Sequence, residues 1–250
     1  MKDSTQRFTD RVSNYIKYRP SYPKEMIQIL AQKTGLLDGK IIADIGSGTG
    51  ILTKQLLEAG CNVYAIEPNK AMRIAAEEAL TSHVGFSSVN ATAENTTLPD
   101  NSVDGITAGQ AFHWFDRLAT KMEFRRILRP EAFIALIWNA WQGELSPFMT
   151  GYTKLLEEWG TDYQRVSRTN IDDAAVRQFF HPKEFEKFTF PNYQIFDYEG
   201  MKGRLLSSSY SPLAGHPKHE PLIEGLASLF QQHQKEGVVR FDYITTLYLG

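Results

Sequence analysis

A glycine-rich segment, Asp44-Ile45-Gly46-Ser47-Gly48-Thr49-Gly50, follows a short apolar run and precedes a run with helical periodicity. Glycines let the chain turn sharply and let a ligand approach the backbone without meeting a Cβ. The helix that follows exposes unpaired backbone N–H groups to whatever the turn holds. In open α/β sheets such a turn lies at the carboxyl edge, where ligands bind. The segment therefore predicts a ligand site.

The type of ligand follows from what the segment lacks. A dinucleotide fingerprint needs glycine at its first, third and sixth positions, and the sixth position counted from Gly46 is Ile51. A phosphate-binding loop needs Gly-Lys-Ser/Thr at its end, and none is present. The carboxylate of Asp44 would repel a pyrophosphate. A carboxylate beside backbone donors suits an amino-acid group, which carries both an ammonium and a carboxylate.

Glu67 ends the second apolar run, 21 residues after Gly46. A carboxylate at this place can accept hydrogen bonds from both hydroxyls of a ribose, as the corresponding acid does in nucleotide-binding folds. The alternative is a solvated acid at the start of the next helix, where the helix dipole favours negative charge. The spacing after the glycine turn favours the ribose.

The elements that must position these residues alternate between short apolar strands and helices. Strands are expected over 41–45, 62–66, 84–89, 103–108, 132–138, 185–196 and 239–249, and helices over 50–58, 70–80, 117–128 and 220–234. This order predicts an α/β fold with a doubly wound, mostly parallel seven-stranded sheet and helices on both faces. We expect one domain over 1–250: an N-terminal helical segment (about 1–35), a ligand-binding core (about 36–139), and a cap with antiparallel C-terminal strands (about 140–250). Within the last part, residues 140–180 are expected to form a helical cap insertion over the carboxyl edge of the sheet.

The composition of the chain limits the kinds of binding partner and the compartment that we expect. The chain has 250 residues and a formal net charge of −2, so no overall positive field attracts nucleic acid or an anionic membrane. Cys61 is the only cysteine, which excludes an internal disulfide and a thiolate zinc cage. The start lacks the apolar stretch of a secretory signal, and the longest apolar run, Ala132–Trp138, is too short to span a bilayer. We expect a cytoplasmic protein with no nucleic-acid or membrane partner and no metal.

These residues resemble the class I S-adenosylmethionine-dependent methyltransferases, specifically the small-molecule group with a type 11 methyltransferase domain that looks like trans-aconitate methyltransferase. The resemblance covers nearly the whole chain. Besides the glycine turn and Glu67, it rests on residues 15–23 (YIKYRPSYP), 92–94 with 98–99 (TAE…LP), 110–115 (QAFHWF), 204–212 (RLLSSSYSP) and the closing stretch 241–250.

The resemblance implies a site for S-adenosylmethionine. Gly46, Gly48 and Gly50 would line its methionine and ribose part, with Ser47 in the same turn. Asp44 would lie near the amino group, and Gln110 beside the methionine. Glu67, followed by Pro68, would hold the ribose, and Thr92, Ala93 and Glu94 would meet the adenine edge. Family members often have aspartate where Thr92 stands, which puts its adenine contact in question. Arg19 is either a partner for the methionine carboxylate or a structural anchor of the N-terminal segment.

The function implied is methyl transfer to a small-molecule acceptor, at an oxygen nucleophile, by in-line displacement. His113 is the candidate general base, and the alternative is that it forms a pocket wall beside Trp114. His216 and His219 have a metal-like spacing but no third ligand pattern. Two other functions stay open: a methyltransferase for RNA or protein, and a non-catalytic S-adenosylmethionine-binding protein. We expect a monomer or a weak homo-oligomer.

Overall fold

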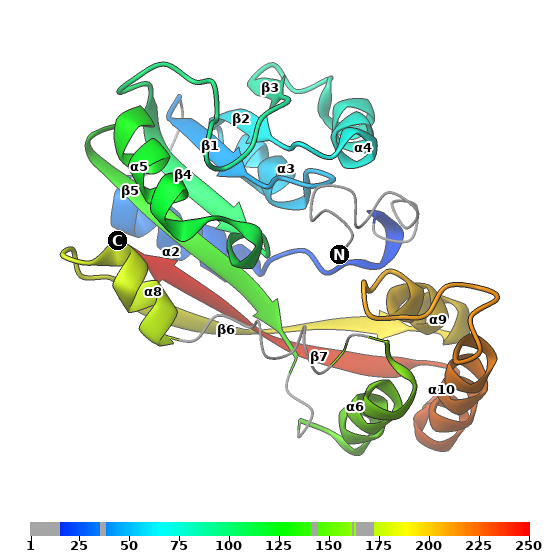
Figure 1. Ribbon diagram of the computed structural model, residues 1–250. Helices are drawn as coiled ribbons and strands as arrows, with labels where there is room; N and C mark the ends of the chain where they lie inside the picture. The colour runs from blue at the N-terminus through cyan, green and yellow to red at the C-terminus, as the bar shows by residue number, and fades with distance from the viewer. Residues whose placement is uncertain (1–15, 36–38, 142–144, 162, 164–172) are drawn as a thin grey trace.

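The computed structural model describes residues 16–35, 39–141, 145–161, 163 and 173–250. Seven strands form one sheet in the order β3-β2-β1-β4-β5-β7-β6 (Figure 1). The strands are β1 Ile41–Ile45, β2 Asn62–Ile66, β3 Phe86–Val89, β4 Val103–Gly109, β5 Leu128–Ala140, β6 Glu186–Phe196 and β7 Val239–Leu249. The first five pair in parallel, and β7 is antiparallel to both β5 and β6. The predicted doubly wound, mostly parallel seven-stranded fold is confirmed.

Helices cover both faces of the sheet. The helices are α2 Lys24–Thr34, α3 Ile51–Glu58, α4 Lys70–Leu80, the short η3 Phe112–Trp114, α5 Arg117–Ile127, α6 Pro147–Trp159, α8 Asp173–Phe180, α9 Tyr198–Leu206 and α10 His219–His233. One apolar core contains side chains of α2 and α3, and the core of the opposite face contains side chains of α5 and α8. Each helix presents an apolar stripe that only contact with the sheet can bury.

The antiparallel pair β6–β7 continues beyond the end of β5. β5 pairs with β7 only over Ile244–Leu249, whereas β6 pairs with β7 along its whole length to Val239. The free end of this ribbon carries α6, α9 and α10 around a third apolar core. Figure 1 shows these three helices grouped at the far end of the two long strands. We call α6, α9, α10 and this end of the ribbon the cap lobe.

The cap lobe differs from the cap expected over residues 140–180. Of the described residues in that stretch, α6, Trp141 and Tyr163 contribute to the third apolar core, and α9, which the sequence pattern did not predict, completes it. Helix α8 instead returns to the sheet, where the Phe179 ring lies 4.5 Å from Phe112 and 6.0 Å from Phe124 between centroids. The apolar stripe of α8 packs on aromatic side chains of the sheet core rather than on the cap lobe.

Candidate functional site

The glycine turn lies at the carboxyl end of β1, beside the point where the strand order reverses between β1 and β4. The carbonyl of Ile66 at the end of β2 accepts from the amides of Gly46 (2.9 Å) and Ser47 (3.1 Å). Gly46 has a φ of 66°, and a Cβ added there would lie 2.5 Å from the Cβ of Ala111. Only glycine therefore fits this position, because the turn approaches the loop after β4 too closely for a side chain.

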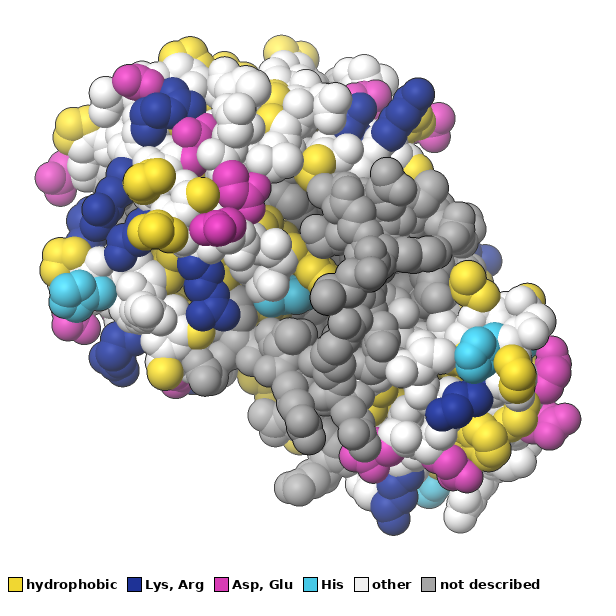
Figure 2. All heavy atoms as spheres, viewed as in Figure 1, with side chains coloured by type: hydrophobic (Ala, Val, Ile, Leu, Met, Phe, Trp, Pro, Cys, Tyr) yellow, Lys and Arg dark blue, Asp and Glu magenta, His cyan; other side chains and the backbone are white. Residues whose placement is uncertain are grey.

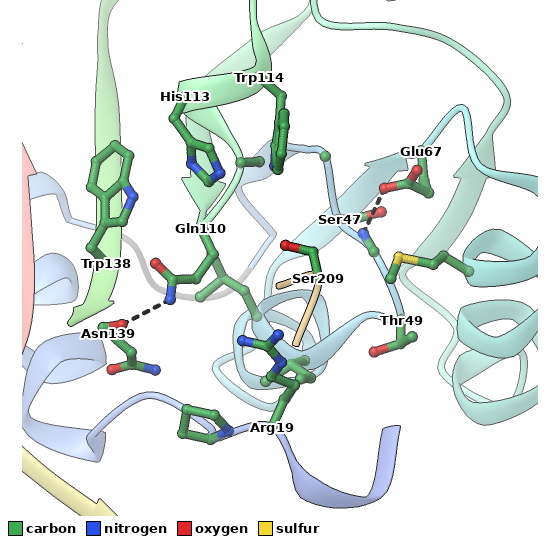
Figure 3. A pocket seen from close by; sticks show the side chains of 18 of the residues that line it. Arg19, Ser47, Thr49, Glu67, Gln110, His113, Trp114, Trp138, Asn139 and Ser209 are labelled. Atoms are coloured by element: carbon green, nitrogen blue, oxygen red, sulfur yellow. Dashed lines mark hydrogen bonds between the residues drawn. The ribbon is translucent and has the colours of Figure 1, made fainter. Parts of the chain in front are cut away.

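A cavity of about 480 Å³ opens above this turn, between the sheet and the cap lobe. Its volume lies within the range of sites for small molecules. The lining includes almost every residue that the sequence assigned to a site: Arg19, Asp44, Gly46, Ser47, Gly48, Glu67, Pro68, Thr92, Ala93, Glu94, Gln110 and His113. Figure 3 shows side chains from the glycine turn, the ends of β4 and β5 and the N-terminal segment around it.

Gly50 is the exception, because it does not line the cavity. It is the N-cap of α3, with a φ of 83°, and a Cβ there would lie 2.6 Å from a side-chain methyl of Leu80 in α4. Its role in the structure is the close contact between α3 and α4. The regular spacing of the three glycines concealed this difference, since the third glycine belongs to the helix start rather than to the turn.

Glu67 joins the tip of β2 to the glycine turn. One carboxylate oxygen accepts from the amide of Gly48 (2.9 Å) and the other from the amide of Asn69 (2.7 Å). Glu67 does not cap the next helix; Asn69 does, accepting from the amide of Met72. Burial raises the pKa of Glu67, and the two backbone hydrogen bonds and Arg73 oppose that rise. A carboxylate can accept about four hydrogen bonds, so its oxygens retain capacity for a ligand.

Asp44 is 1% exposed and ties three elements together at the floor of the cavity. Its carboxylate accepts from the hydroxyls of Thr53 in α3 (2.6 Å) and Thr107 in β4 (2.9 Å). Burial raises the pKa of Asp44 to about 6, against the two hydroxyl hydrogen bonds, which lower it. A cationic group entering the cavity would favour the ionised form of this carboxylate.

Two hydroxyls of the turn provide an independent indication of a ligand. Ser47 Oγ and Thr49 Oγ1 are buried and have no hydrogen-bond partner among the described residues. Buried polar atoms are normally satisfied, so these two point to partners that a bound molecule supplies. Thr49 was not among the predicted site residues, although its position within the glycine segment could have indicated that it lines the site.

Thr92, Ala93 and Glu94 line the cavity from the loop between β3 and β4, and that loop is held by hydrogen bonds within the fold. Glu94 accepts from the backbone amide of Asp116 (2.9 Å), just before α5, so part of its carboxylate is already used. Thr92 forms an isolated bridge with Asn95, which holds the tight turn that carries Ala93. The expected contacts to an adenine edge thus come from a turn that is anchored on both sides.

The N-terminal segment crosses from the cap lobe to the core. Arg19 donates to the carbonyl of Ser207 at the end of α9 (3.1 Å). Three residues further on, the backbone of Tyr22 exchanges two hydrogen bonds with the side chain of Gln55 in α3 (3.2 and 2.8 Å). Arg19 lines the cavity as well, so this geometry is compatible with both of its expected roles, carboxylate partner and anchor.

Gln110, directly after β4, adopts a left-handed backbone conformation with a φ of 58°. Its side-chain amide donates to the carbonyl of Asn139 at the end of β5 (2.8 Å), as Figure 3 shows. A non-glycine residue in this conformation costs energy that the surrounding structure must repay, and such residues concentrate at functional sites. His113 lies in η3 and lines the cavity with its ring 4.6 Å from that of Trp114.

Most residues of the cap-lobe wall of the cavity were not among the predicted site residues. This wall is formed by aromatic and polar side chains from several distant segments: Trp141, Thr153, Tyr163, Arg204, Ser209, Tyr210 and Tyr243. Trp141 directly follows β5, Thr153 lies in α6 and Tyr243 in β7, and no short motif unites these three. Arg204 lies in α9, and Ser209 and Tyr210 follow that helix, within the stretch 204–212 on which the family resemblance rests in part. Across the described ranges, no group of three or more potential metal ligands exists, and no helix has the length and apolarity needed to cross a membrane.

The chain is similar in sequence to proteins described as methyltransferases. A family model described as a methyltransferase domain matches residues 43–136. An uncharacterized methyltransferase of Oceanobacillus iheyensis is 33% identical over 62% of this chain and 75% of its own length. An uncharacterized methyltransferase of Mycobacterium tuberculosis (strain H37Rv) is 37% identical over 55% of this chain; the match spans 54% of that relative, about half its length.

Among solved structures, a protein of Anaeromyxobacter dehalogenans described as a type II methyltransferase aligns with a TM-score of 0.65. The alignment covers 93% of this chain and 97% of that one, at 22% identity, and it shows a shared fold. The family model, the bacterial relative and the glycine turn that is hydrogen-bonded to the acidic tip of β2 together show that this chain belongs to the class I S-adenosylmethionine-dependent methyltransferases.

Proposed function

We propose that this protein transfers a methyl group from S-adenosylmethionine to a small-molecule acceptor, with oxygen as the accepting atom. The observation that carries the proposal is the single cavity that extends from the glycine turn and Glu67 to the aromatic wall of the cap lobe. One end offers backbone and carboxylate groups, and the other offers mainly rings. A cofactor and a small acceptor can therefore meet inside one cavity.

The residues at the first end suit the cofactor. Ser47 Oγ and Thr49 Oγ1 are buried without a partner in the described part of the chain, and Glu67 retains acceptor capacity for a ribose. Asp44 lines the same end and is available to a cationic amino group. When bound, S-adenosylmethionine supplies a methyl group already activated on a sulfonium sulfur.

The task left to the chain is to hold the acceptor in line with that methyl group. Positioning of this kind supplies up to about 7–11 kcal/mol of the barrier. Side chains of the cap lobe form one wall of the cavity, and Gln110, which is anchored to the carbonyl of Asn139, lines the same cavity. A carboxylate acceptor needs no base, whereas a phenol or an alcohol needs one, and His113 is then the residue that removes the proton.

The surface supports a small acceptor rather than a nucleic acid. Figure 2 shows acidic and basic side chains interspersed over the described part of the visible face. The net charge of −2 also supports this choice, and we propose neither nucleic acid nor a membrane as partner. The single, buried Cys61 is compatible with the cytoplasm, which we propose as the compartment. A monomer or a weak homo-oligomer is the proposed assembly.

Calorimetric titration with S-adenosylhomocysteine and, separately, with NADH tests the cofactor. Binding of the thioether without binding of NADH is the expected result, and the reverse pattern would refute the proposal. A screen with tritium-labelled S-adenosylmethionine over small carboxylic acids, phenols and amines then tests the acceptor, with bulk tRNA and a protein extract as further arms. Label appearing only in RNA or protein would refute a small-molecule acceptor.

A further inference from the structure

Arg204 is a buried cation in the cap-lobe wall of the cavity, 3% exposed. Its Nε donates to the hydroxyl of Tyr243 (2.9 Å), and one terminal nitrogen donates to the hydroxyl of Ser208 (3.0 Å). Its guanidinium carbon lies 5.8 Å from the ring of Trp141 and 5.1 Å from that of Phe241. Nowhere in the described ranges does a carboxylate accept from it.

A buried charge normally has a counter-charge, since removing an ion from water costs several kcal/mol. Arginine cannot escape this cost by losing its proton. Rings and two hydroxyls offset part of the cost, but a guanidinium has five N–H donors and these contacts use two. Arg204 lines the cavity, and no carboxylate of the described residues accepts from its remaining donors. An oxyanion from outside would satisfy both the charge and the donors.

The rest of the lining limits how many negative charges such a ligand carries. Among the described lining residues, Arg19 and Arg204 are the cations, whereas three carboxylates, Asp44, Glu67 and Glu94, line the same cavity. A ligand with several negative charges would be repelled by this set. The walls on either side of Arg204 are aromatic, so they favour an apolar or aromatic body.

We propose that Arg204 determines the specificity of the acceptor site: the acceptor carries one oxyanion, a carboxylate or a phosphate, on an apolar or aromatic body. This inference rests on the proposed methyl transfer. It assigns Arg204 to the acceptor, whereas the glycine turn and Glu67 serve the cofactor.

The test uses the full chain saturated with S-adenosylhomocysteine and titrated by calorimetry with four probes. Benzoate and phenyl phosphate are the two oxyanions, benzamide is the neutral analogue of benzoate, and propane-1,2,3-tricarboxylate is the polyanion. Arg204→Met removes the charge and keeps the bulk, and Arg204→Lys keeps the charge. Arg240→Met is the matched control, because Arg240 is an exposed arginine of β7 that pairs with Asp242 outside the cavity.

At least one oxyanion is expected to bind about tenfold or more tightly than benzamide and the tricarboxylate, and the stronger of the two identifies carboxylate or phosphate. Arg204→Met should remove this preference, whereas Arg240→Met should keep it. Both variants should bind S-adenosylhomocysteine within about twofold of the unaltered protein. Equal binding of benzamide, tighter binding of the tricarboxylate, no binding of either oxyanion, or an unchanged preference in Arg204→Met would each overturn the inference.

Two features keep the outcomes separate. The comparison of benzoate with benzamide on the unaltered protein decides the question even where Arg204→Met fails to fold. Failure of the unaltered protein to bind S-adenosylhomocysteine would refute the proposed function itself, whereas binding of the thioether without any preference for an oxyanion would refute only the role of Arg204.

Discussion

Replacing Glu67 by alanine separates two roles that this carboxylate combines. In the absence of cofactor it accepts from the amides of Gly48 and Asn69, so the change leaves two backbone donors without their acceptor. Each hydrogen bond to a charged group contributes about 1.5–3 kcal/mol, but water from the cavity can replace part of this. We expect the free energy of unfolding to fall by about 2 kcal/mol, which lowers the melting temperature of a chain of this size by about 4–8 °C.

The effect on cofactor binding should be larger. The variant loses the acceptor for the ribose hydroxyls and also loosens the turn that Glu67 holds in place. Loss of hydrogen bonds to one charged group should raise the dissociation constant for S-adenosylhomocysteine by roughly tenfold to a hundredfold or more. Calorimetric titration at 25 °C, well below the melting temperature of the variant, measures this directly.

Glu123→Ala is the matched control for this experiment. Glu123 is also a buried carboxylate, and it accepts from the amide of Thr96 (2.7 Å) and from Arg126 (2.8 Å), but it does not line the cavity. Its loss should lower stability at least as much and leave the affinity for S-adenosylhomocysteine within about twofold. If Glu67→Ala binds the thioether as the unaltered protein does, Glu67 only supports the turn and the assignment to the ribose is wrong.

Three further predictions concern the same site. Burial raises the pKa of Asp44 from 3.8 to about 6, so the folded chain holds this proton more tightly than the unfolded chain, and the stability that this group contributes is complete below about pH 4 and lost as the pH rises through 6. In urea titrations, the free energy of unfolding of Asp44→Asn should therefore rise by about 3 kcal/mol relative to that of the unaltered protein across this pH window. A difference between the two proteins that stays constant with pH would contradict this. Gly46→Ala should unfold at lower denaturant than Gly48→Ala, because the new Cβ meets Ala111 at 2.5 Å in the first case and only the sulfur of Met72 at 3.7 Å in the second; equal midpoints would refute the clash. His113→Ala should lower kcat for a phenolic acceptor by about a hundredfold or more with unchanged affinity for S-adenosylhomocysteine, and unchanged turnover would leave His113 a wall residue.

Local sequence patterns were sufficient to predict where most strands of the sheet lie in the chain. The strands β1, β2 and β7 and the helix α4 begin and end at the residues that periodicity predicted. Such elements are encoded by neighbours in the chain: an apolar run, a helical stripe, or a cap such as Asn69. The strand β5 was predicted too short, because Leu128–Glu131 extends it with half-exposed and charged residues that no apolar pattern marks.

Patterns of this kind are weaker where one segment could pack in more than one place. The apolar stripe of α8 was compatible with a cap and with the core, and contact with Phe112 and Phe124 decided for the core. Gly50 belonged to a regular glycine series, yet contact with Leu80 gives it a different role. Neither outcome is readable from the residues next to these positions.

The sequence by itself determined the turn after β1, the acidic residue at the tip of β2 and the order of strands and helices, because each depends on residues a few positions apart. Tertiary structure alone decided which side chains form the cap-lobe wall of the cavity. Arg204 meets Tyr243 across 39 positions, and Asn139 accepts from Thr245 across 106. Contacts over such separations form only when whole elements dock, and docking depends on which apolar surfaces remain to be buried once the sheet is complete.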